Sequence, residues 1–202
     1  MNDSFTLSSI PVSLTWKNQP FHSTSDARQQ LSITTGSNTD WFIDPAGAPV
    51  KDNAPIALFV PPDSTFGLQA KVTVEFAATY DAGTLFIYTH DALWGKLCFE
   101  YSPQQQPMIV SVVTRGVSDD CNSVSVRDHS VYLRVYRQSE ALAFHYSLDG
   151  HYWHFVRHFS LGNLDQLRVG FSTQSPMGEG CKAIFSEIRY TPNPLSNLRN
   201  GE

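Results

Sequence analysis

The feature that most constrains the fold is a period of two in hydrophobicity along the segment 66–76. Apolar side chains there alternate with polar ones, the apolar set being Leu68, Ala70, Val72, Val74 and Phe76. Successive side chains of a β-strand point to opposite faces, so this alternation predicts a strand with one buried face and one solvent-facing face.

Similar short runs recur along most of the chain. They lie at 31–36, 54–61, 84–89, 95–101, 108–114, 131–137, 142–148, 152–158, 167–173 and 183–190. The dipeptide Asp149-Gly150 predicts a hairpin, because Gly accepts the positive φ that a tight turn requires. Short strands without helical periodicity predict an all-β jelly-roll sandwich of two antiparallel sheets. We expect one domain over residues 1–202, with a core at about 5–191 and a polar tail at 192–202.

Composition excludes several classes of function. The net charge is −5 and the 14 Lys and Arg residues are spread singly, which argues against a nucleic-acid partner. No apolar segment is long enough to span a bilayer, and the first residues lack the features of a signal peptide, so we expect a cytoplasmic protein without a membrane partner. The three separated cysteines predict reduced thiols.

No cofactor is expected, since neither the histidines nor the cysteines have zinc-ligand spacing. Calcium is compatible with Asp119-Asp120 or Asp40 and Asp44, but no motif supports it.

Polar residues on the strands at 80–116 predict a binding surface. Lys96, Glu100, Ser111 and Arg115 are expected on one face of neighbouring strands, opposite an apolar face. Together with residues from further strands they predict a mixed-charge patch on one concave sheet, consisting of Glu75, Lys96, Glu100, Ser111, Arg115, Arg134 and His145. Arg115 offers a planar fork for carboxylate, phosphate or sugar hydroxyls, and a salt bridge to Glu100 or Asp119 is the alternative.

Two further residues are ambiguous at the level of sequence. Asp81, in the turn Tyr80-Asp81-Ala82-Gly83, either caps backbone N–H groups or faces a ligand. Trp94 lies at a predicted strand edge, where it either stacks on a sugar ring or belongs to the core.

Six ordered motifs between Trp16 and Tyr190 carry a family resemblance. They are Thr35–Phe42, Tyr80–Gly83, Trp94–Ser102, Ser111–Gly116, Tyr146–Trp153 and Val169–Gly180. Together they resemble the DUF1349 (regulation-of-enolase-like) proteins of the concanavalin A-like lectin/glucanase superfamily. The resemblance implies a jelly roll of two curved sheets and an architecture used by lectins, glycosidases and the accessory domain of many β-xylosidases, but it implies no particular reaction.

The leading hypothesis is a non-catalytic module that binds a carbohydrate or a similar small polar ligand on the concave sheet. One alternative is a glycoside-active enzyme with Glu75 and Glu100 as its two carboxylates, although the Glu-x-Asp-x-x-Glu pattern of the superfamily's glucanases is absent. Another is a regulatory domain that binds a metabolic enzyme, and a protein partner or a homodimer stays open.

Overall fold

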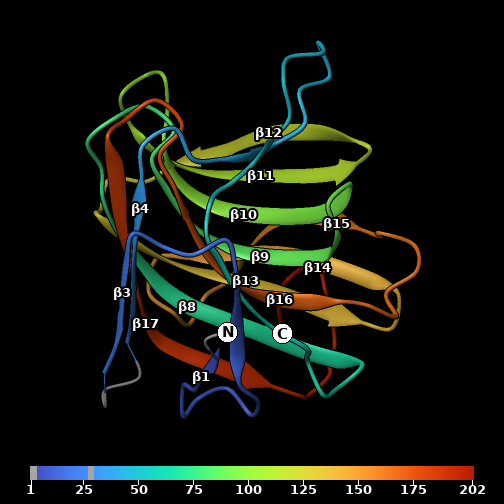
Figure 1. Cartoon of the computed structure of the whole chain (residues 1–202). Coiled ribbons are helices and arrows are strands. Elements are labelled where there is room, and N and C mark those ends of the chain that lie inside the picture. Colours follow the sequence, from blue (N-terminus) through green and yellow to red (C-terminus); the bar gives the residue numbers. More distant parts are fainter. Residues whose placement is uncertain (1–3, 27–29) are drawn as a thin grey trace.

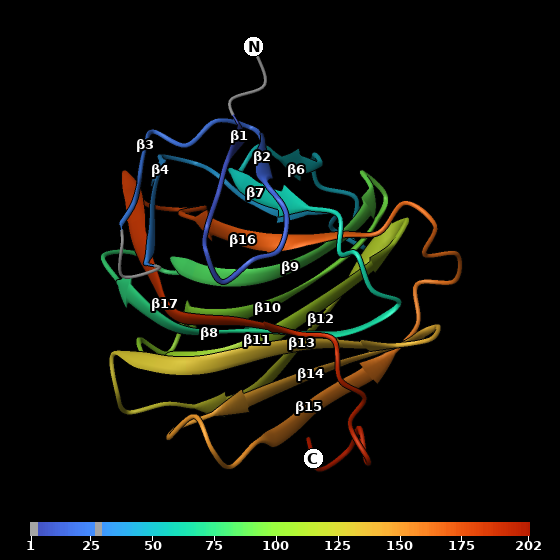
Figure 2. The same ribbon diagram turned by 90° about the horizontal axis from the view of Figure 1, so that it is seen from below.

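The computed structural model describes residues 4–26 and 30–202 as two large antiparallel sheets packed face to face, which confirms the predicted sandwich (Figures 1 and 2). Sheet A has eight strands in the order β1 (Ser4–Phe5), β2 (Leu14–Lys17), β7 (Ile56–Phe59), β16 (Arg168–Gln174), β9 (Ala82–His90), β10 (Leu93–Tyr101), β11 (Pro107–Arg115) and β12 (Val117–Ser125). Sheet B has seven strands in the order β15 (His154–Phe159), β14 (Ala141–Ser147), β13 (Ser130–Gln138), β8 (Thr65–Glu75), β17 (Gly180–Thr191), β4 (Leu31–Gly36) and β3 (His22–Ser25).

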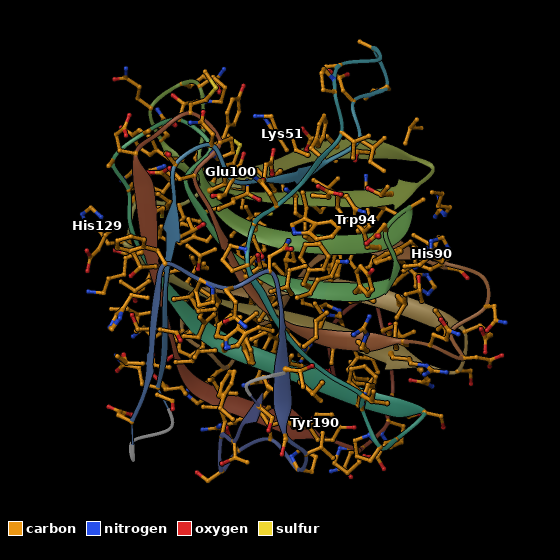
Figure 3. The ribbon with its side chains drawn as sticks, viewed as in Figure 1. Lys51, His90, Trp94, Glu100, His129 and Tyr190 are labelled. Carbon is orange, nitrogen blue, oxygen red and sulfur yellow. The ribbon has the colours of Figure 1, made fainter. Side chains whose placement is uncertain are left out.

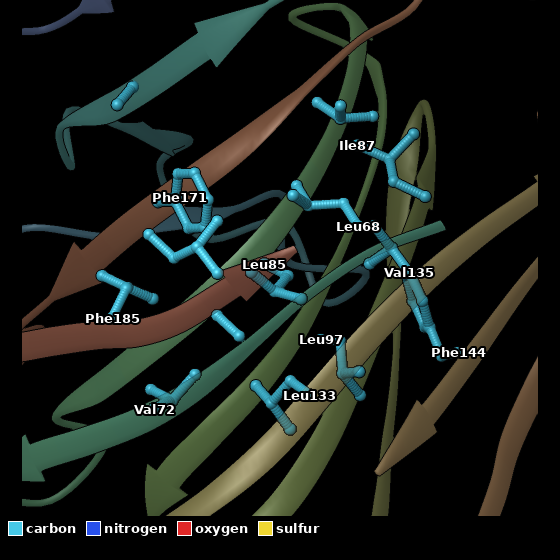
Figure 4. Close-up of a cluster of buried hydrophobic side chains, with 14 of the residues drawn as sticks. Leu68, Val72, Leu85, Ile87, Leu97, Leu133, Val135, Phe144, Phe171 and Phe185 are labelled. Atoms are coloured by element: carbon cyan, nitrogen blue, oxygen red, sulfur yellow. The ribbon is translucent and has the colours of Figure 1, made fainter. Parts of the chain in front are cut away.

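The main core lies between the two sheets. Figure 4 shows Leu68 and Val72 of β8 in one cluster of buried side chains with Leu85 and Leu97, which come from sheet A. On β8 the alternation predicted from the sequence is confirmed, since Leu68, Ala70, Val72 and Val74 are buried while the residues between them are partly exposed.

A second apolar cluster covers the outer face of sheet A. Its buried members are Trp41, Ala54, Ile56, Leu58, Phe86, Tyr88, Trp94 and Val112. Trp41 comes from the segment between β4 and β7, which passes across sheet A (Figure 1) and contains the two-stranded pair β5 (Trp41–Phe42) and β6 (Lys51–Asp52). This cluster fixes the segment on the sheet and so positions the side chains beside it.

The C-terminal segment after β17 covers the outer face of sheet B. Figure 2 shows it beside β14 and β15. The guanidinium of Arg134 donates a hydrogen bond to the carbonyl of Gly201 (2.9 Å), and Nε2 of His145 donates to the carbonyl of Leu198 (2.7 Å). The tail that the sequence suggested to be polar is therefore docked on strands β13 and β14.

Within the described residues there is no helix long and apolar enough to cross a membrane.

At Gly170 the fold leaves no room for a side chain. It pairs with Leu58 on one side and Phe86 on the other, and a Cβ atom added to it would lie 1.7 Å from the backbone oxygen of Ala57. We expect Gly170→Ala to lower the free energy of unfolding by about 1–3 kcal/mol, because β7 and β16 must separate. Urea denaturation measures this. Gly36→Ala, with nothing within 4 Å of the added Cβ, is the matched control; equal stabilities of the two variants would contradict the expectation.

Candidate functional site

A pocket of about 230 Å³ opens on the outer face of sheet A. Its lining side chains come from four strands, a turn and the segment that crosses the sheet: Asp40, Phe42, Tyr80, Lys96, Glu100, Val112, Asp120 and Gln174. Drug-sized ligands occupy pockets of roughly 300–1,000 Å³, so this pocket suits a smaller molecule, of the size of one sugar ring.

Strand β10 supplies the centre of the pocket because of its alternation. Trp94, Lys96, Cys98 and Glu100 point outward, whereas Leu97 and Phe99 enter the core between the sheets. Figure 3 shows Trp94 and Glu100 toward opposite ends of this strand.

Lys96 is held in a nearly buried cluster. Its side chain is 3% exposed, and Nζ donates hydrogen bonds to Oδ1 of Asp40 (2.9 Å) and to Oε1 of Gln174 (2.7 Å). Burial disfavours the ammonium, but the negative charges around it, that of Asp40 first, outweigh burial and raise the pKa of Lys96. Lys96 therefore stays charged, and two of its three N–H donors are already engaged.

Asp40 is fixed by its own segment as well as by Lys96. Its Oδ1 atom also accepts from the backbone N–H of Trp41 (2.7 Å), and its backbone carbonyl accepts from the N–H groups of Asn53 and Ala54 (3.1 and 3.2 Å). Because Trp41 is 1% exposed and donates from Nε1 to the carbonyl of Ala54 (2.8 Å), the ion pair is anchored to the second apolar cluster.

Glu100 differs from its neighbours because its carboxyl group has no partner. It is 8% exposed, and within residues 4–26 and 30–202 no hydrogen bond or ion pair reaches it. Burial raises the pKa of Glu100 to about 8; the charge of Lys96 opposes this rise, and the charges of Asp120 and Asp40 add to it. At neutral pH the group is largely a protonated acid that faces the pocket.

Two neighbouring groups share this electrostatic environment. Burial raises the pKa of Asp120, with Lys96 acting in the opposite direction. Burial also raises the pKa of the Cys98 thiol well above its usual value, so Cys98 stays a neutral thiol. The pocket thus combines the positive charge of Lys96 with two carboxyl groups, those of Glu100 and Asp120, that ionise less readily than usual.

The turn before β9 places Tyr80 at the pocket. Asp81 is fully buried; its Oδ2 atom accepts from the N–H groups of Ala77 and Ala78 (2.9 and 2.8 Å), and its Oδ1 atom accepts from the hydroxyl of Ser175 (2.7 Å). The structure therefore places Asp81 inside the turn as a cap of backbone donors, away from the pocket lining. Tyr80 has a φ of 69°, in the left-handed region, and is 38% exposed.

The predicted common face for Lys96, Glu100, Ser111 and Arg115 is wrong. Lys96 pairs with Val112 of β11, and Leu97 pairs with Ser111, so Ser111 lies on the core side with Leu97. Arg115 lies on that side too, where its guanidinium donates to the carbonyl of Ser160 (3.1 and 3.0 Å). Because Ser111 is the single polar residue in the run Met108–Val113 of β11, this run lacks the alternation that would have fixed its orientation.

Glu75, Arg134 and His145 also lie elsewhere, which corrects the prediction of one continuous patch. All three belong to sheet B, and their side chains are on its outer face. Glu75 is exposed and pairs with Lys182 (2.7 Å). Arg134 and His145 are buried under the C-terminal segment, and burial lowers the pKa of His145 to about 4, so its ring is neutral there.

Glu75 and Glu100 cannot act together as two catalytic carboxylates, because they belong to different sheets. The two sheets of a sandwich pack about 10 Å apart, and these side chains point away from each other on opposite outer faces, whereas a retaining glycosidase requires about 5 Å between its carboxyl groups.

Trp94 belongs to the second apolar cluster. It is fully buried and packs edge-to-face against Trp41, with ring centroids 6.1 Å apart. Stacking of Trp94 on a sugar ring is therefore wrong for this structure, and the aromatic rings at the pocket are Phe42 and Tyr80.

Sequence reasoning placed none of Asp40, Phe42, Tyr80, Val112, Asp120 and Gln174 in the small-molecule site, although it weighed Asp40 and Asp120 as calcium ligands. Five of them lay inside motifs already noted: Asp40 and Phe42 in 35–42, Tyr80 in 80–83, Val112 in 111–116 and Gln174 in 169–180. No local pattern indicates the contact of Gln174 with Lys96, because it joins residues 78 positions apart.

No group of three or more His, Cys, Asp or Glu side chains suited to a metal ion occurs among the residues that the structure describes.

A family model described as protein of unknown function (DUF1349) matches residues 16–193. The chain belongs to the DUF1349 family. Among solved structures, a functionally unknown protein from Saccharomyces cerevisiae has a TM-score of 0.82 and 28% identity, over 91% of this chain and 97% of the yeast chain. Comparison with curated protein sequences finds no match.

Other similar structures share the fold alone. A bifunctional GH43-CE protein from Bacteroides eggerthii has a TM-score of 0.74 and 16% identity, over 92% of this chain and 24% of its own. The GH43 protein BlXynB from Bacillus licheniformis has a TM-score of 0.65 and 17% identity, over 82% of this chain and 33% of its own. The alginate lyase from Klebsiella pneumoniae has a TM-score of 0.52 and 9% identity, over 84% of this chain and 83% of its own. The DUF1349 chain thus spans a third or less of these two GH43-containing proteins.

Proposed function

We propose that this DUF1349 protein is a non-catalytic module that binds a monosaccharide or a similar small polyol in the pocket of sheet A. The observation that carries the proposal is Glu100, a carboxyl group that is 8% exposed, has no partner among the described residues and faces a pocket. Buried polar groups are normally hydrogen-bonded, and an unpartnered one beside open space is satisfied when a ligand supplies the missing partner.

The surrounding groups suit a hydroxyl-rich ligand. Lys96 is held by Asp40 and Gln174, and the Gln174 side chain also donates to the carbonyl of Tyr80, so the two side chains form a rigid polar floor. Phe42 and Tyr80 add aromatic surface against which the C–H face of a sugar ring packs. The likeness to GH43 proteins and to an alginate lyase agrees with a carbohydrate-related role, at the level of the fold.

Glu100 and Asp120, two of the three carboxyl groups of the pocket, lie too far apart to act as the pair of a retaining glycosidase, which favours binding over catalysis. Asp120 aligns with Lys96 across two strand spacings, and Glu100 lies four residues further along β10. With about 4.8 Å between strands and 3.4 Å per residue, the Cα atoms of Glu100 and Asp120 are on the order of 16 Å apart, too far for the close pair of a retaining glycosidase.

A titration of the purified protein with common monosaccharides and polyols tests the proposal. We expect at least one to bind and to raise the melting temperature, and Phe42→Ala to weaken that binding about tenfold, since the half-buried ring loses its contact with the ligand. Glu75→Gln, on the other sheet, is the matched control and should bind as the unaltered protein does. Binding that Phe42→Ala leaves unchanged, or no binding by any member of the set, would reject the pocket as the site.

A further inference from the structure

The chemistry of the pocket favours one subclass of polar ligand. Three carboxyl groups, those of Asp40, Glu100 and Asp120, line it together with a single ammonium group, that of Lys96. Even with Glu100 protonated, the two carboxylates of Asp40 and Asp120 outnumber the ammonium of Lys96, so an anionic ligand such as a sugar phosphate or a uronic acid is disfavoured.

The free hydrogen-bond donors and acceptors of the pocket also favour a cationic ligand. Lys96 has one N–H donor left, and one N–H of the Gln174 side chain already donates to the carbonyl of Tyr80 (3.2 Å). Both oxygens of Glu100 and the second oxygen of Asp40 accept no hydrogen bond from the described residues. Once Glu100 is ionised, these three acceptors outnumber the two free donors, so a ligand that complements this state supplies donors, and an ammonium group supplies three together with the missing positive charge.

We propose that the ligand is an amine-bearing sugar or amino polyol whose ammonium group binds the Glu100 carboxylate, while its hydroxyl groups meet Lys96 and Gln174. This inference rests on the proposed function of the pocket and narrows its ligand class. The aromatic rings of Phe42 and Tyr80 at the same pocket are compatible with an ammonium group, which is attracted to the face of an aromatic ring.

Binding of an ammonium group to Glu100 is coupled to the release of the proton that this carboxyl group carries. The groups that face Glu100 are Lys96 and Cys98 of its own strand, Asp120 of β12, Asp40 of the crossing segment and Tyr80 of the turn before β9. Among them only Lys96 favours the ionised carboxylate, and Asp40 already neutralises much of its charge. An arriving ammonium group adds the positive charge that is lacking, so Glu100 releases its proton when the ligand binds near neutral pH.

Calorimetric titrations with matched pairs of sugars test this inference. The pairs are glucosamine and glucose, galactosamine and galactose, and mannosamine and mannose, each measured at pH 7 in buffers of different ionisation enthalpy. We expect the amine of at least one pair to bind at least tenfold more tightly than its neutral partner, with release of up to one proton from Glu100. Glu100→Gln should remove both the preference and that proton release, whereas Glu75→Gln should keep both.

The outcomes separate this inference from the proposed function. If only neutral sugars bind, or if amines bind without a preference that Glu100→Gln removes, the inference is wrong and the sugar-binding function stands. If neither member of any pair binds, both are rejected. Because glutamine has the shape of a protonated glutamate, the variant is expected to fold, and a melting curve checks this.

Discussion

Replacing Asp40 by alanine is expected to lower the free energy of unfolding by about 3–5 kcal/mol, since removal of one partner leaves the other charge of a buried pair uncompensated. Lys96 is 3% exposed and would keep only the Oε1 atom of Gln174 as an acceptor. The same change removes the acceptor for the N–H of Trp41, which anchors the crossing segment to the sheet. Urea denaturation followed by tryptophan fluorescence measures the loss, because Trp41 and Trp94 lie in the affected cluster.

A double variant separates the ion pair from the loss of the anchor. Adding Lys96→Met to Asp40→Ala removes the unpaired charge, and most of the lost stability should return, because an apolar residue of similar size is tolerated where a charged one lacks its partner. Glu75→Ala breaks an exposed pair, Lys182 with Glu75, and should cost at most about 1 kcal/mol. If Asp40→Ala and Glu75→Ala lowered the free energy of unfolding equally, the ion pair in the pocket would be no stronger than an exposed one, which would contradict the prediction.

The sequence predicts the sheets well where side chains alternate. On β10, Lys96 and Glu100 were correctly placed opposite Leu97 and Phe99, because a period of two fixes which residues share a face. On β11 the run Val110–Val113 includes Ser111 among apolar residues, and a single small polar residue does not determine which face is buried. Orientation there is set by pairing with β10, which no local pattern encodes.

The site itself is less predictable because it is built from contacts between distant segments. Lys96 meets Asp40 across 56 positions and Gln174 across 78, and each contact depends on which strands become neighbours. The order of strands in sheet A, with β16 beside β9, brings Gln174 into the same cross-strand row as Ala82 and Glu100. A single sequence reveals the elements but not this order.

Arg134 and His145 illustrate a second limit. Both are polar residues facing outward on sheet B, a pattern that predicts exposure. Instead the segment that ends the chain buries them, with carbonyl groups of Gly201 and Leu198 as hydrogen-bond acceptors. Coverage by a segment without regular structure leaves no periodic signal, so the two residues were assigned to a binding patch that does not exist as a continuous surface.

Glu100→Gln is expected to stabilise the protein at alkaline pH and to leave it nearly unchanged in acid. Burial raises the pKa of Glu100 to about 8, from an ordinary value of 4.5, so between these values the folded protein holds a proton that the unfolded chain releases. The contribution of Glu100 to the free energy of unfolding of the unaltered protein therefore falls as pH rises from 4.5 to 8, and the loss is complete above 8. Glutamine resembles the protonated acid and escapes this loss, so the variant should be more stable by about 5 kcal/mol at pH 9.

Urea denaturation of both proteins between pH 4 and pH 9 gives two curves whose separation should grow through this window and then level off. Glu75→Gln is the matched control, because Glu75 is exposed and pairs with Lys182, and its curve should not rise above that of the unaltered protein in this way. Parallel curves for Glu100→Gln and the unaltered protein would show that the carboxyl group is not desolvated in the folded state. When removal of a charged group at a pocket stabilises a protein, that group is characteristically one that serves ligand binding at a cost in folding stability. The stability of Glu100→Gln and its loss of amine binding are therefore two independent measurements of the same carboxyl group.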